Sequence, residues 1–240
     1  MYQERSYRNQ MLSENFIQFN VTELESDLQI ISKINLKSEA SALIKKYRKQ
    51  LNDYIQDDPN FLESLIPITP KKDAPDIVKH MCLSALLTNV GPMAAVAGAI
   101  AQYVGMELLN YTDEIIIENG GDIFLSSKTI KHVLIYAGCS PFSNKISLEI
   151  PGSNKPLGIC TSSGTLGHSL SFGKADAVVV LAKDTSLADA CATSICNMIQ
   201  TPSDIESGIS FAKSVYGIEG ILVIAGDKMG AWGDINLVSP

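Results

Sequence analysis

Asp189 and Thr193 are the side chains best placed by type and spacing to do chemistry. They are four residues apart in the run Ala-Asp-Ala-Cys-Ala-Thr (188–193), so in a helix they point from one face, one turn apart. A carboxylate among small apolar neighbours needs a cation, a donor or a helix N-terminus. A carboxylate and a hydroxyl suit part of the oxygen shell of Mg²⁺. The alternative is structural: Asp189 supports its own helix and Thr193 bonds back to the i−4 carbonyl.

A second candidate is the hydroxyl-rich segment that begins at Thr161. It continues through Ser162, Ser163 and Gly164 to His168. Hydroxyls and unhindered backbone amides at a strand end can surround a phosphate or carbonyl with donors. His168 could act as a base or ligand donor. The alternatives are a polar loop and a structural histidine.

A third candidate is Asn119-Gly120-Gly121-Asp122, which lies between two apolar runs. Consecutive glycines allow positive φ and a close approach of the backbone to a ligand. The same four residues also suit an ordinary hairpin turn.

The composition limits the ligands that these segments could serve. The chain has 240 residues, 19 Lys and Arg against 26 Asp and Glu, and a net charge of −7, which argues against nucleic acid or an anionic membrane as partner. All three arginines, Arg5, Arg8 and Arg48, lie in the first fifth of the chain, so a phosphate bound further on needs a metal or backbone amides. Neither a P-loop nor a zinc-ligand motif is present.

The cysteines indicate a reducing compartment. The five have no CxxC spacing and several have apolar neighbours, which predicts reduced, mostly buried thiols in a cytoplasmic protein. A different enzyme that uses Cys160 or His168 is a further alternative, although the apolar run before Cys160 favours its burial.

The pattern of apolar residues predicts an α+β fold with antiparallel sheets. Helices are predicted at 37–57, from 76 into the uncharged 81–101 segment with a fresh start at Pro92, at 186–199 and at 203–216. Strands are predicted at 16–21, 28–34, 114–117, 123–125, 132–136, 145–150, 157–161, 177–181, 221–224 and 234–238. The order strand-strand-helix-helix-strand-strand occurs in the second half and can be traced in the first. We therefore expect two α+β halves, 1–140 and 141–240, with the site between them, and a buried helix pair rather than a membrane span at 81–101.

Taken together, the three segments resemble the ApbE family of magnesium-dependent FAD:protein FMN transferases. The family's order is kept by residues 119–122, 161–164 and 188–193. Residues 91–98 and 160–169 look closer still to an uncharacterised cytoplasmic branch of ApbE-related proteins. The resemblance implies a duplicated fold related to the T-fold.

The resemblance also implies a site. Asp189 and Thr193 would bind Mg²⁺ with a backbone carbonyl near Asn119, and FAD, FMN or another nucleotide diphosphate would lie between Gly120–Gly121 and Ser162–Gly164. Asp189 and His168 are the candidate catalytic residues. The expected reaction is attack of an acceptor hydroxyl on the FMN phosphorus, with release of AMP.

One departure from the family keeps an alternative open. The family's His-x-x-Asp-Pro-x-x-Gly stretch is absent, and only 24 residues separate Gly164 from Asp189. The alternative is a non-catalytic ligand-binding or assembly protein with the same fold. A homo-oligomer is compatible with either function.

Overall fold

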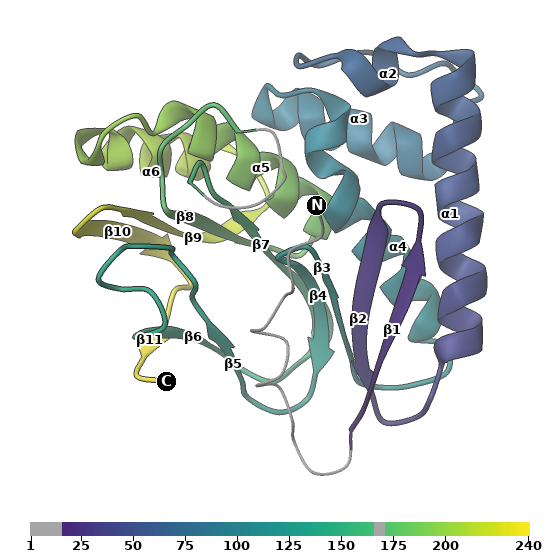
Figure 1. Ribbon diagram of the computed structural model, residues 1–240, viewed down its shortest axis with the longest axis horizontal. Helices are drawn as coiled ribbons and strands as arrows, with labels where there is room; N and C mark the ends of the chain where they lie inside the picture. The colour runs from purple at the N-terminus through teal and green to yellow at the C-terminus, as the bar shows by residue number, and fades with distance from the viewer. Residues whose placement is uncertain (1–15, 166–170) are drawn as a thin grey trace.

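Helices cover one face of a large antiparallel sheet, and a small sheet covers the other (Figure 1). The computed structural model describes residues 16–165 and 171–240. The predicted α+β fold with antiparallel sheets is confirmed. The strands of the large sheet, in spatial order, are β1 (Ile17–Glu23), β2 (Ser26–Ser32), β3 (Ile115–Asn119), β4 (Asp122–Ser127), β7 (Ser153–Ser162), β8 (Ala177–Ala182), β9 (Ile218–Ala225) and β10 (Lys228–Gly233). The small sheet has the order β11 (Leu237–Val238), β6 (Ser147–Ile150), β5 (Lys131–Leu134).

The helices fall into two groups along the chain. Between β2 and β3 lie α1 (Lys37–Asp57), α2 (Asn60–Glu63), α3 (Asp76–Thr88), the 3₁₀ helix η2 (Pro92–Ala95) and α4 (Val96–Leu108). Between β8 and β9 lie α5 (Thr185–Met198), the 3₁₀ turn η3 (Pro202–Asp204) and α6 (Ile205–Ser214). Each group is therefore flanked by two strands on either side. The relation to the T-fold and the boundary at residue 140 stay predictions.

The central strands separate two apolar layers because alternate side chains point to opposite faces of the sheet. In β4, Phe124 packs with the helices, whereas Ile123 and Leu125 pack toward the small sheet. In β8, Val178 and Val179 divide in the same way. Burial on both faces explains why β8 reads as a continuous apolar run in the sequence.

The uncharged 81–101 segment is a broken helix pair, as predicted. Helix α3 ends at Thr88, its capping residue Asn89 has a left-handed φ of 56°, and Pro92 starts the next helical segment. Within the described residues no single helix is long and apolar enough to cross a membrane. The pair α3 and Pro92–Leu108 meets that test only together, across a bend of 103°.

The C-terminal prediction needs a correction. The strand predicted at 234–238 is limited to β11, and β10 was not predicted. Strand β10 lies at the edge of the large sheet and is largely exposed, so its residues lack the apolar alternation that marks a half-buried strand. Trp232 pairs with Ile221 in the β9–β10 hairpin.

Candidate active site

Asp189 lies on the second turn of α5 and is buried against the start of α4. Its Oδ2 accepts a hydrogen bond from the backbone N–H of Gly98, at 2.8 Å. A Cβ at position 98 would lie 2.4 Å from the Thr185 carbonyl oxygen and 2.8 Å from the Asp189 Cβ. The glycine therefore allows the close approach of the two helices that brings the carboxylate to the first turn of α4.

Asn119, the last residue of β3, hydrogen-bonds to Ala97, the residue of α4 that precedes Gly98. Its Nδ2 donates to the Ala97 carbonyl oxygen at 3.0 Å. Asn119 and Asp189 thus bind consecutive residues of α4 from different elements. Ala97 lies inside α4, where its carbonyl oxygen is also the acceptor for the helical N–H of Ala101. The expectation that a backbone carbonyl near Asn119 binds Mg²⁺ stays a prediction.

The 119–122 segment is a two-residue hairpin turn between β3 and β4. Gly120 and Gly121 have φ of 72° and 110°, which such turns require at both central positions. The Gly121 N–H donates to Glu118 Oε1 at 2.9 Å. A Cβ built on Gly121 would lie 3.7 Å from the Thr161 carbonyl oxygen, so the turn lies beside the end of β7. Its role as a hairpin turn is confirmed, and the turn also lies at the candidate site.

Asp122 places a second buried carboxylate near Asp189. Burial, followed by the nearby charge of Asp122, raises the pKa of Asp189 well above its ordinary value, and the backbone N–H groups of Gly98 and Ala97 offset part of the rise. The Cys160 thiol lies near both acids, and burial with those charges raises its pKa also. Two carboxylates in one buried site favour a shared proton or a bound cation.

The hydroxyl-rich segment is only partly at this site. Thr161 lies beside the glycine turn, while the buried Ser162 lies near the Cys196 thiol. Burial raises the pKa of that thiol, and Ser171 and then Ser162 partly offset the rise. Ser163 and Gly164 bond to the Ala175 carbonyl oxygen, at 3.5 and 2.9 Å. His168, predicted as a catalytic residue, lies outside the described residues.

The structure therefore brings together Asn119, Asp122, Thr161 and Asp189, from β3, β4, β7 and α5. Thr193 follows Asp189 by one helical turn and is half-buried. Sequence reasoning missed Ala97 and Gly98 as site residues, although a glycine in an alanine-rich helix start was a usable signal of close packing.

The donor set fits Mg²⁺ better than a transition metal. Within residues 16–165 and 171–240 no group of three or more His, Cys, Asp or Glu side chains is placed to hold a metal ion. The available oxygens are carboxylate, hydroxyl and carbonyl, the ligands that a hard cation takes. A cation would also relieve the repulsion between the two buried carboxylates.

An α+β fold with this cluster defines an ApbE-like protein. The chain matches the family model described as AbpE bacteria over residues 8–212 and belongs to that family. It is 43% identical over 214 residues to a UPF0280 protein of Methanococcus aeolicus, covering 84% of this chain and 86% of the relative. It is 42% identical over 202 residues to the UPF0280 protein MJ1526 of Methanocaldococcus jannaschii, covering 82% of each.

Solved structures share the fold at low sequence identity. The flavin transferase ApbE from Vibrio cholerae superposes with a TM-score of 0.60 at 14% identity, covering 91% of this chain and 96% of that one. The ApbE protein from Thermotoga maritima gives a TM-score of 0.61 at 13% identity, covering 90% and 96%. At such identities the likeness concerns the fold.

Proposed function

We propose that this protein binds FAD with Mg²⁺ between the 119–122 turn and Asp189, and transfers the FMN group to an acceptor hydroxyl. The observation that carries the proposal is the pair of buried carboxylates, Asp122 and Asp189, beside the glycine turn and the first turn of α4. A pair that raises the pKa of one member in the ion-free protein is suited to receive a cation. The flavin transferase name of a fold relative supports the choice of FAD.

Each residue has a distinct part in this proposal. Asp189 and Thr193, with a backbone carbonyl near Asn119, would hold Mg²⁺, which would neutralise pyrophosphate charge. Asn119 fixes Ala97, and Gly120 and Gly121 allow the backbone to approach the phosphates. In the reaction the acceptor oxygen bonds to the FMN phosphorus, the phosphorus–oxygen bond to AMP breaks, and the hydroxyl proton leaves to solvent.

Calorimetry tests the binding step. FAD should bind wild-type protein in Mg²⁺ and lose most of its affinity in EDTA and in Asp189→Asn. Asp113→Asn is a matched control, because Asp113 is an exposed carboxylate that pairs with Lys33 and Lys128. Equal binding with and without Mg²⁺, or equal losses in the two variants, would contradict the proposal.

Mass spectrometry tests the transfer step and separates the alternative function. Incubation with FAD, Mg²⁺ and a hydroxyl-bearing acceptor peptide should release AMP and add the FMN mass to the peptide. Mg²⁺-dependent FAD binding without AMP release would favour the non-catalytic ligand-binding protein, which the short segment between Gly164 and Asp189 motivates.

We also propose a cytoplasmic location. All five cysteines are free thiols, four of them buried, which supports a reducing compartment.

A further inference from the structure

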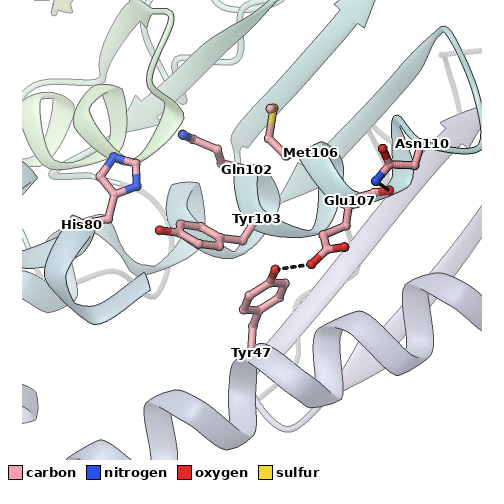
Figure 2. A pocket seen from close by; sticks show the side chains of 7 residues that line it. All are labelled: Tyr47, His80, Gln102, Tyr103, Met106, Glu107 and Asn110. Carbon is pink, nitrogen blue, oxygen red and sulfur yellow. Dashed lines mark hydrogen bonds between the residues drawn. The ribbon is translucent and has the colours of Figure 1, made fainter. Parts of the chain in front are cut away.

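A cavity of about 390 Å³ lies between α1, α3 and α4, apart from the carboxylate pair. The side chains that line it are Tyr47, His80, Gln102, Tyr103, Met106, Glu107 and Asn110, and we call it the aromatic cavity (Figure 2). Its volume lies within the range of small-molecule sites. The four residues from α4 recur at helical spacing, so they form one outward face of that helix.

Three rings form the wall of the aromatic cavity. The centroids of Tyr47 and Tyr103 are 5.2 Å apart at an interplanar angle of 68°, and those of His80 and Tyr103 are 5.8 Å apart at 60°. Figure 2 shows the three rings in a row, with Glu107 beside Tyr47. Inclined rings of this kind offer both faces and edges to a planar ligand, and their faces attract cations.

The charges around the aromatic cavity are mainly negative. Glu107 lies at one end, and Asp184 pairs with His80 Nε2 at the other, at 2.5 Å. Burial, with the charges of Asp76, Tyr47 and Asp184, raises the pKa of Tyr103 to about 12. The Lys46 ammonium reaches the rim of the cavity, where it pairs with Glu107 Oε1 at 2.8 Å and lies 4.8 Å from the centroid of the Tyr47 ring. Three acids, Asp76, Glu107 and Asp184, act on the cavity against this one lysine. A cation is therefore favoured over an anion.

At the Glu107 end of the aromatic cavity, some polar atoms are bonded to the protein and others are left for a ligand. The Tyr47 hydroxyl and Lys46 Nζ both donate to Glu107 Oε1, at 2.9 and 2.8 Å, while Oε2 has no hydrogen bond within the described residues. Asn110 Nδ2 donates to the Glu107 carbonyl oxygen at 3.0 Å, which leaves Asn110 Oδ1 as an acceptor. The two remaining oxygens suit a ligand that carries N–H donors.

We infer that the aromatic cavity binds a small aromatic cation, a planar ring that carries an amidinium, guanidinium or ammonium group. The ring contacts Tyr103 and Tyr47, and the cationic group donates to Glu107 Oε2 and Asn110 Oδ1. The inference does not depend on the proposed flavin site.

Three probes of similar shape and different charge test the inference. Ligand-observed NMR titrations of the full chain would compare benzamidine, benzamide and benzoate, which are cationic, neutral and anionic at pH 7. We expect benzamidine to bind best and benzoate least. No saturable benzamidine binding at low millimolar concentration, or benzoate binding as well as benzamidine, would overturn the inference.

Variants locate the binding. Glu107→Gln should weaken benzamidine about 10-fold, and Tyr103→Leu should weaken it while Tyr103→Phe retains it. Asp113→Asn removes one exposed carboxylate elsewhere and Asp189→Asn removes the proposed metal ligand, so both should bind as wild type does. If Tyr103→Leu does not fold, the benzamidine affinity of Glu107→Gln, a substitution at a half-buried side chain, still tests the site. Equal weakening by Glu107→Gln and Asp113→Asn would show non-specific attraction and refute the site.

Discussion

Asp189→Asn should stabilise the ion-free protein at neutral pH while abolishing its response to Mg²⁺. The folded protein raises the pKa of Asp189 because the carboxyl is buried and lies near the Asp122 charge. The folded protein therefore favours the protonated form of Asp189 over the ionised form. The stability that this group contributes is complete below its unfolded pKa, near 4, and is lost as the pH rises toward the folded pKa. Asparagine does not titrate and avoids that loss.

The size of the effect follows from the contacts of the carboxylate. Each unit of pKa shift corresponds to about 1.4 kcal/mol, and the Gly98 and Ala97 N–H groups compensate part of the burial cost. An asparagine Oδ1 can keep the hydrogen bond from Gly98, and its Nδ2 can donate toward Asp122. We expect the free energy of unfolding in EDTA to rise by about 1–3 kcal/mol at pH 8, and to change little at pH 4.

Urea denaturation followed by circular dichroism, at pH 4 and pH 8, measures this difference. Mg²⁺ at a thousandfold its Kd should reverse the order at pH 8, because such a ligand stabilises wild type by about 4.1 kcal/mol. Asp113→Asn is a control with the opposite sign: Lys128 and Lys33 lower the pKa of Asp113 to about 2, so its contribution is present above pH 4 and lost as the pH falls. If Asp189→Asn destabilises the ion-free protein equally at both pH values, the reasoning about the buried pair is wrong.

Three further predictions concern packing and reactivity. Gly98→Ala should lower the free energy of unfolding by about 1–2 kcal/mol, because its Cβ would lie 2.4 Å from the Thr185 carbonyl; an unchanged Tm would contradict this close approach. Gly121→Ala should lower the free energy of unfolding by about 1–2 kcal/mol, because an alanine is strained at the φ of 110° that Gly121 adopts. Only one atom lies within 4 Å of the added Cβ, so crowding contributes little. Thermal unfolding should show the loss whether or not FAD is bound. In native protein the exposed Cys139 should react first with a thiol reagent, and Cys160, buried with a raised pKa, only on unfolding; rapid labelling of Cys160 would revive an enzyme that uses this thiol.

The local pattern of apolar residues was sufficient to predict most of the helices and strands. Helix α1 (Lys37–Asp57) agrees with its prediction at both ends because its apolar residues follow the helical period over 21 residues. The sequence pattern did not predict strand β10, because an exposed edge strand is stabilised by backbone pairing with one neighbour rather than by apolar side chains.

The sequence alone determined which residue types the candidate site contains and their order along the chain. Each residue type, such as the amide of Asn119, the glycine at 121 or the carboxylate of Asp189, carries its chemistry wherever the chain places it. Only the tertiary structure decided their partners. Asp189 meets Gly98 across 91 residues of chain, and that contact depends on two helices packing without a Cβ between them. The aromatic cavity likewise combines three helices whose separate sequences carry no common motif. Such contacts arise from the packing of elements distant in sequence, which the spacing of residues along the chain does not encode.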